Sequence, residues 1–124
     1  MTNKASVLVI DDDRTTIALI EAALEGSDFD VKTTMSSNEG INISKLSTPD
    51  IILLDKNMPE MSGEKVLTWL KLDDDTKNIP VIMLTGDDDM MSISSSLEQG
   101  AADHIVKPFG RTNLIARINK AVGK

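Results

Sequence analysis

A chain of 124 residues has the usual size of one domain and can bury a substantial core without disulfide or metal staples. Its 40% hydrophobic and 27% charged residues are typical of a globular protein, and no apolar stretch approaches the roughly eighteen residues that a membrane span needs. The formal net charge of −7 argues against direct binding to nucleic acid, whose phosphates require a basic face.

Cysteine is absent, which excludes disulfides, thiolate catalysis and cysteine-bound zinc. His104 is the only histidine, which removes every metal site or catalytic dyad that needs two imidazoles. The N-terminus passes directly into a short apolar run, without the longer apolar segment and cleavage site of a secretory signal. We therefore expect one cytoplasmic domain, residues 1–124, with a protein partner and no membrane association.

Four short apolar runs predict strands that are buried on both faces, because such strands lose the alternation of apolar and polar residues. These runs are residues 7–10, 51–54, 81–84 and 105–106. Residues 29–34 do alternate, which is typical of a half-exposed strand near the edge of a sheet, and we assign them as the second strand.

Between these strands, apolar residues recur at the spacing of a helix. The pattern is clearest in Ile17, Ile20 and Leu24, in Val66, Leu67 and Leu70, and in Leu114, Ile118 and Ala121. Glycine and proline positions agree with this pattern. Gly26, Gly100 and Gly123 lie where helices would end, and Pro49 and Pro80 precede two of the strands. Five βα units result, which predicts an α/β fold with a parallel sheet and helices on both faces.

Polar residues follow the buried strands at the point where each strand ends. They are Asp11 and Asp12, then Asp55, Thr85 and Lys107. The carboxyl ends of parallel strands share one rim, and ligands bind where the strand order reverses. Crowded carboxylates repel one another, so the cluster requires a cation or a raised pKa. Mg²⁺ suits it, because this ion is held by one or two carboxylates with water and phosphate oxygens.

Asp55 is the candidate nucleophile, because an aspartate can carry a phosphoryl group that a metal, the Thr85 hydroxyl and the Lys107 charge would stabilise. Each residue alone also has an ordinary structural interpretation. Asp12 or Asp13 can cap the following helix, and a lysine is usually solvated. The order of the whole set along successive strands is more specific than any member.

Four segments resemble the receiver domain of two-component response regulators. They are residues 7–13, 53–59, 84–86 and 106–109. Gly63 and the run 100–103 are similar to two further landmarks, so the resemblance covers essentially the whole chain. It implies a flavodoxin-like fold, a doubly wound (βα)5 parallel sheet with strand order 2-1-3-4-5.

The resemblance also implies the roles of the site residues. Asp55 matches the phosphoacceptor, and Asp11 and Asp12 match the acidic pair that binds Mg²⁺ together with Asp55 and the backbone carbonyl of Asn57. Asn57 and Asp87 match the positions that flank the attacking water and tune the lifetime of the phosphorylated state. Asp87 has a competing interpretation as a helix cap.

Thr85 and Lys107 match the phosphate sensors, and the peptide between Lys107 and Pro108 matches one that is typically cis. Phosphorylation adds roughly −1.5 to −2 charges near these sensors and can draw both inward. An aromatic residue commonly rotates as the threonine moves, and His104 stands at that position. His104 is therefore either a switch, made pH-sensitive by its ordinary pKa of about 6.5, or an exposed polar residue on an edge strand.

The phosphohistidine donor is expected in trans, from a sensor histidine kinase or a histidine phosphotransfer protein, because His104 fits no kinase motif. The output is expected to be a downstream protein bound by the surface of the serine-rich segment 92–96, the strand at 105–106 and the helix that contains Leu114. Serine is a mediocre helix former, so segment 92–96 is intrinsically weak. We expect a monomer or a weak, phosphorylation-dependent dimer.

Three alternatives stay open at this stage. A phosphohydrolase similar to the haloacid dehalogenases usually has a second acid where this chain has Asn57, and a flavodoxin-like cofactor module needs a phosphate-binding loop where residues 11–13 are acidic. The chain can also be a receiver cut from a longer regulator. We expect a signalling module that phosphorylates and dephosphorylates itself, and not a turnover enzyme.

Overall fold

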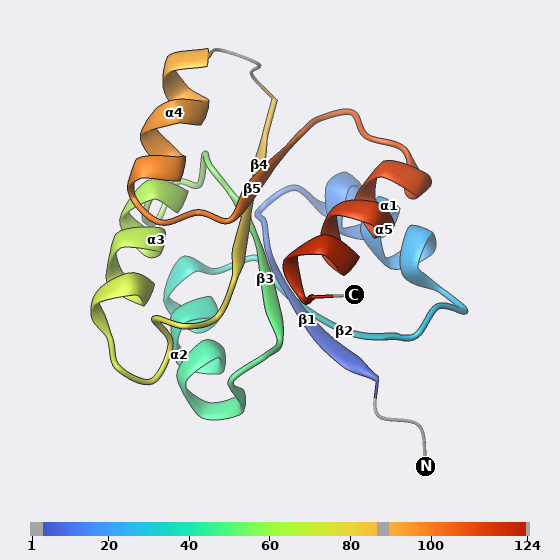
Figure 1. Ribbon diagram of the computed structural model, residues 1–124, viewed down its shortest axis with the longest axis horizontal. Helices are drawn as coiled ribbons and strands as arrows, with labels where there is room; N and C mark the ends of the chain where they lie inside the picture. Colours follow the sequence, from blue (N-terminus) through green and yellow to red (C-terminus); the bar gives the residue numbers. More distant parts are fainter. Residues whose placement is uncertain (1–3, 87–89, 124) are drawn as a thin grey trace.

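The computed structural model describes residues 4–86 and 90–123, and within them a parallel sheet lies between two layers of helices (Figure 1). The strands are β1 (Ala5–Ile10), β2 (Phe29–Thr34), β3 (Ile51–Asp55), β4 (Val81–Thr85) and β5 (Asp103–Val106). The helices are α1 (Arg14–Leu24), α2 (Ser37–Ser47), α3 (Gly63–Leu72), α4 (Met90–Glu98) and α5 (Arg111–Ala121). The strand order β2-β1-β3-β4-β5 confirms the predicted flavodoxin-like fold.

The core has two halves, one on each face of the sheet, because successive residues of a strand point to opposite sides. Val7 and Val9 pack beneath α1 and α5, while Leu8 and Ile10 pack beneath α2 and α3. Figure 1 shows α1 and α5 on one side of the strands and α2, α3 and α4 on the other. Burial on both faces explains why the central strands read as unbroken apolar runs.

The edge strand β2 follows its alternating sequence over most of its length. Phe29 is buried and Asp30 and Lys32 are exposed, while Thr34, on the same face as Asp30 and Lys32, is buried at the end of the strand. Two central strands are longer than their apolar runs, since β3 includes Asp55 and β4 includes Thr85. Backbone pairing does not depend on side-chain polarity, so each strand continues into the polar residue that ends it.

Side chains satisfy free backbone N–H groups where three of the helices begin. Asp13 accepts a hydrogen bond from Thr15 N at 3.0 Å and so caps α1, while Ser36 and Ser62 cap α2 and α3. Gly26, Gly100 and Gly123 have positive φ where helices end, as predicted. None of the helices in the described ranges is long and apolar enough to cross a membrane.

Gly63 brings the start of α3 close to the end of β3. Its N–H donates to the carbonyl of Lys56 at 2.8 Å, and a Cβ added there would lie 2.1 Å from the carbonyl oxygen of Asp55. Only glycine fits at this approach without a shift of the backbone. The loop between Asp55 and α3 is therefore short and tightly closed.

Gly63→Ala should destabilise the fold by about 2 kcal/mol or more, because the new methyl group meets backbone atoms that cannot rotate away. Gly86→Ala is the matched control, since no atom of the described residues lies within 4 Å of its added Cβ, and it should change stability by less than about 0.5 kcal/mol. Urea denaturation followed by circular dichroism measures both, and equal effects would contradict this explanation.

Candidate functional site

Three carboxylates meet at the carboxyl ends of the central strands. One carboxylate oxygen from each of Asp11, Asp12 and Asp55 lies within 4.8 Å of the other two. The parallel pairing of β1 with β3 aligns Ile10 with Leu54, which sets Asp11 beside Asp55. Asp11 is 0% exposed and Asp55 5% exposed, so little water reaches either group. The predicted acidic cluster is present.

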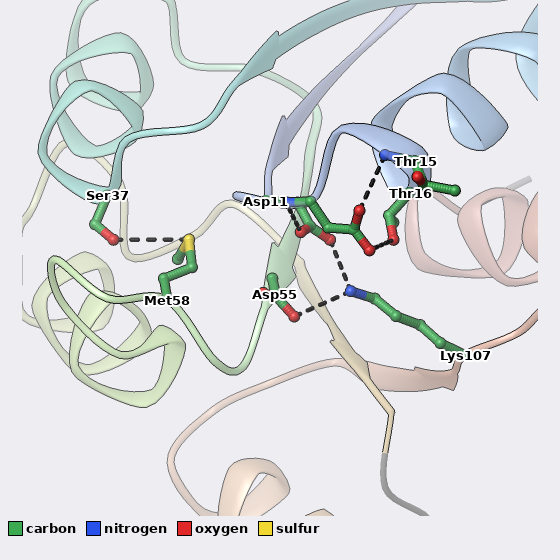
Figure 2. A network of polar contacts seen from close by, with 8 residues as sticks. Asp11, Thr15, Thr16, Ser37, Asp55, Met58 and Lys107 are labelled. Atoms are coloured by element: carbon green, nitrogen blue, oxygen red, sulfur yellow. Dashed lines mark hydrogen bonds and ion pairs between the residues drawn. The ribbon is translucent and has the colours of Figure 1, made fainter.

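Lys107 places its ammonium group between two of these carboxylates. Its Nζ lies 3.0 Å from Oδ2 of Asp11 and 3.2 Å from Oδ1 of Asp55, as Figure 2 shows. Lys107 directly follows β5, and its backbone N–H donates to the carbonyl of Thr85 at 2.6 Å. The peptide between Lys107 and Pro108 is cis, as the resemblance implied. A residue distant in sequence thus supplies the counter-charge of the cluster.

Burial and neighbouring charges shift the pKa values of both Asp55 and Lys107. Burial, and then the nearby Asp11 carboxylate, raises the pKa of Asp55 from 3.8 to about 6, although Lys107 opposes the shift. Burial alone would lower the pKa of Lys107, but the Asp11 and Asp55 carboxylates outweigh it and raise that pKa. Lys107 therefore stays protonated, and its charge does not offset the combined effect of burial and the neighbouring carboxylates on the pKa of Asp55.

Asp12 and Asp13 have separate roles. The Asp13 carboxylate accepts hydrogen bonds from Thr15 N and, at 3.0 Å, from Thr16 Oγ1, so it faces α1. The Thr16 hydroxyl is the main cause that lowers the pKa of Asp13. Asp11 Oδ1 accepts from the backbone N–H of Asp13 at 2.9 Å. Asp13 is thus a helix cap, while Asp12 belongs to the acidic cluster.

The remaining predicted residues lie around the cluster with different exposure. Thr85 ends β4 and is 2% exposed, and the pairing of Asp55 with Leu84 places Thr85 near the same rim. Asn57 is exposed in the loop after β3. Asp87 lies outside the described residues.

His104 is buried, so its interpretation as an exposed polar residue is wrong. Its neighbour Ile105 packs beneath α1 and α5, so His104 points to the face that α2, α3 and α4 cover. The exposure of His104 is determined by the helices that cover this face of the sheet, and not by the edge position of β5. Within the described residues Nε2 of His104 has no hydrogen-bond partner, and burial is the main cause that lowers its pKa.

One polar network was not foreseen from the sequence. Glu60, in the loop after β3, accepts hydrogen bonds from Ser36 and Asn38, and Ser37 donates to the carbonyl of Met61 at 2.8 Å. Residues 36–39 have the serine and glutamate spacing of a capping box, which signals the start of α2. No local pattern signals the contact with Glu60, which is 24 residues from Ser36 in the chain.

Comparison with known proteins agrees with this fold. Residues 7–119 match the family model of the response regulator receiver domain. The chain therefore belongs to the receiver domains of two-component response regulators, which act as signalling modules. This membership favours the receiver interpretation over the phosphohydrolase and the cofactor-binding module.

Individual relatives support the assignment. The cell cycle transcriptional regulator CtrA of Caulobacter vibrioides is 38% identical over 116 residues, which are 94% of this chain and 49% of CtrA. The chain thus spans about half the length of the curated relatives that it matches. A putative response regulator from Chloroflexus aurantiacus has a TM-score of 0.92 at 26% identity, covering 98% of this chain and 99% of that one.

A further structure shares the fold. The receiver domain of a sensor histidine kinase from Pseudomonas aeruginosa has a TM-score of 0.89 at 21% identity, and the match covers 98% of this chain and 99% of that domain. That domain was crystallised with a magnesium ion coordinated in its active-site cleft.

Asp55→Asn should stabilise the metal-free protein at pH 7.5. Folding raises the pKa of Asp55 from 3.8 to about 6, so the ionised carboxylate disfavours the folded state as pH rises through that window. In the presence of a chelator, urea denaturation should show a gain of about 1–3 kcal/mol at pH 7.5. The gain should vanish near pH 3.5, where Asp55 is protonated in both states. A variant no more stable than the wild type at pH 7.5 would contradict the charge balance described here.

His104 should make stability depend on pH. Its pKa in the folded state is below the usual 6.5, so the unfolded chain binds the proton first as pH falls. The wild type should therefore lose stability below about pH 6.5 relative to His104→Phe, which keeps a ring and does not titrate. Asp103, Arg117 and Lys56 act on His104 and are unchanged in the variant. Parallel stability curves from pH 7.5 to pH 5 would refute this expectation.

Proposed function

We propose that this chain accepts a phosphoryl group on Asp55 from a phosphohistidine partner, in a Mg²⁺-dependent reaction, and relays the change to another protein. One observation carries the proposal: the Asp55 carboxylate lies in a cluster with Asp11 and Asp12 and 3.2 Å from the Lys107 ammonium. An anionic nucleophile beside a fixed positive charge is what transfer of a phosphoryl group to a carboxylate requires.

The chemistry is a single displacement. A carboxylate oxygen of Asp55 bonds to phosphorus while the bond from phosphorus to the donor imidazole nitrogen breaks, and that imidazole retains the electron pair and takes up a proton. Because the pKa of Asp55 is about 6, most molecules carry the ionised nucleophile at pH 7.5. Lys107 is placed to offset the negative charge of the incoming phosphoryl oxygens, so positioning and charge carry the reaction.

The side chains of the cluster fit a magnesium ion. They offer carboxylate oxygens, the donors that this hard cation prefers, and burial together with the Asp11 carboxylate raises the pKa of Asp55 even with Lys107 beside it. We assign Asp11, Asp12 and Asp55, with the backbone carbonyl of Asn57, as the residues that would hold it. When bound, the ion would neutralise charge on the phosphoryl oxygens. The magnesium found in the Pseudomonas receiver supports this assignment.

The relay of the signal would begin at Thr85 and Lys107, which are joined through the backbone at the ends of β4 and β5. A phosphoryl group on Asp55 adds charge that draws the Thr85 hydroxyl and the ammonium group toward it. His104 is the proposed second part of the switch, since its buried Nε2, without a partner among the described residues, would gain one by changing rotamer. Asn57 and Asp87 would tune the lifetime of the phosphorylated state.

The partners follow from this chemistry. The donor is a sensor histidine kinase or a histidine phosphotransfer protein, because His104 is buried and is the only histidine of the chain. We propose that the downstream protein binds the surface of α4, β5 and α5, where Leu97 and Val106 are exposed. We further propose a monomer, or a dimer that forms weakly on phosphorylation.

Incubation with acetyl phosphate and Mg²⁺ should add one phosphoryl group to the wild type, seen as a mass increase of about 80 Da by intact-mass spectrometry. Asp55→Asn should show no increase, because it lacks the nucleophile. Asp74→Asn is the control, since its side chain is 91% exposed in a surface pair with Lys77, and it should react like the wild type.

Omitting Mg²⁺ should abolish the mass increase. Modification of Asp55→Asn to the extent of the wild type would show that another residue is the acceptor. A wild type that stays unmodified, even with a phosphohistidine protein as donor, would refute the proposed function.

A further inference from the structure

The first turn of α2 is bonded to the loop that follows the candidate phosphoacceptor. Glu60 Oε1 accepts from Ser36 Oγ at 2.9 Å and from the backbone N–H of Asn38 at 3.3 Å, and Glu60 Oε2 accepts from Asn38 Nδ2 at 3.1 Å. These hydrogen bonds place a carboxylate at the N-terminus of a helix, where the helix dipole favours negative charge.

Two further bonds fasten the same loop to the same helix. Ser37 is fully buried and donates to the carbonyl of Met61 at 2.8 Å, with Sδ of Met58 at 3.7 Å from its hydroxyl (Figure 2). The base of the loop is closed by the bond from Gly63 N to Lys56 O at 2.8 Å. The loop that contains Asn57 is therefore fixed by hydrogen bonds where it closes between Lys56 and Gly63 and where it lies against α2.

A second set of hydrogen bonds links the start of α2 to Asp11 of the acidic pair. Asp11 N donates to the carbonyl of Thr34 at 3.1 Å, and Thr34 Oγ1 accepts from Ser36 N at 3.2 Å. The hydrogen bonds thus run from Asp11 through Thr34 and Ser36 to Glu60 without a break. They join the two chain segments that supply the proposed metal ligands, the one after β1 and the one after β3.

The helix in the middle of this connection has little freedom to move. A Cβ added at Gly40 would lie 2.5 Å from Cδ1 of Ile10, so α2 sits directly on the last residue of β1. Ser36 also caps α2 by accepting from Glu39 N at 3.2 Å, so its hydroxyl serves the helix and Glu60 together. Such contacts define a rigid support for the loop, comparable to the outer hydrogen bonds that orient metal ligands elsewhere.

We propose that Glu60 is a positioning residue that sets the spacing between the Asp11–Asp12 pair and the Asn57 segment, and thereby the affinity of the site for Mg²⁺. The inference rests on the proposed function, because it assumes that these segments hold the ion. Glu60 is not one of the proposed metal ligands. It acts by keeping the loop in the arrangement that the ion requires, so that the ion does not have to order it on binding.

The test compares Mg²⁺ affinity, by isothermal titration calorimetry, for the wild type, Glu60→Ala, Glu60→Gln and Lys45→Ala. Lys45→Ala is the matched control: it removes a surface contact at the opposite end of α2, where Lys45 Nζ pairs with Asp73 Oδ2 at 3.1 Å and lies 5.4 Å from the Trp69 ring centre. Glu60→Gln keeps an oxygen that can accept from Ser36 and Asn38.

Glu60→Ala should raise the dissociation constant for Mg²⁺ about fivefold, the effect of losing roughly one net hydrogen bond. Glu60→Gln should recover most of that loss, and Lys45→Ala should leave the constant within about 1.5-fold of the wild type. In the metal-free protein, the amides of residues 56–58, 60 and 61 should exchange hydrogen faster in Glu60→Ala than in Lys45→Ala, which a general loss of stability would not produce.

Two failures are distinguishable. If the wild type binds Mg²⁺ but Glu60→Ala changes the affinity no more than Lys45→Ala, the role of Glu60 is refuted and the proposed function stands. If the wild type binds no Mg²⁺ at millimolar concentration, the metal site of the proposed function is refuted, and the inference with it.

Discussion

The repulsion among Asp11, Asp12 and Asp55 governs the chemistry of this domain, because the parallel sheet forces their carboxylates to within 4.8 Å of one another at its rim. The fold cannot relieve that repulsion by moving one group, since Asp11 and Asp55 extend from neighbouring buried strands. Positive charge has to come from elsewhere. Lys107 supplies part of it from the end of β5, and burial together with the Asp11 carboxylate still raises the pKa of Asp55. A site of this kind is prepared for a cation and for an event that changes its charge.

The elements that build the rim also connect it to the rest of the molecule. Lys107 donates through its backbone N–H to the carbonyl of Thr85, so in the proposed function a change of charge at Asp55 would reach both β4 and β5. On the other side, Thr34 and Ser36 link Asp11 to the start of α2. The rim is therefore supported by hydrogen bonds on one side and joined to the proposed output surface on the other. This asymmetry suits the proposed function, in which the metal site stays in place while the output surface changes shape.

Much of this arrangement could be predicted from the sequence, because the fold has strong local signals. Apolar runs located the central strands, and the polar residues that end them identified Asp11, Asp55 and Lys107 as neighbours. What could not be predicted depends on contacts between distant segments. The burial of His104 depends on the helices that cover its face, which its position on an edge strand does not reveal. The bond of Glu60 to α2 has no periodic signature, since both partners lie in irregular or terminal turns.

Titration of the aspartate carboxyl groups by NMR in the metal-free protein tests the central claim most directly, on the wild type and on Lys107→Met. The charge balance described here predicts a pKa of about 6 for Asp55 in the wild type. It predicts a higher value in the variant, because the ammonium group that favours the ionised form is gone. A pKa of Asp55 near the ordinary 3.8 in both proteins would contradict the account, since burial and the neighbouring carboxylates would then not disfavour the ionised form.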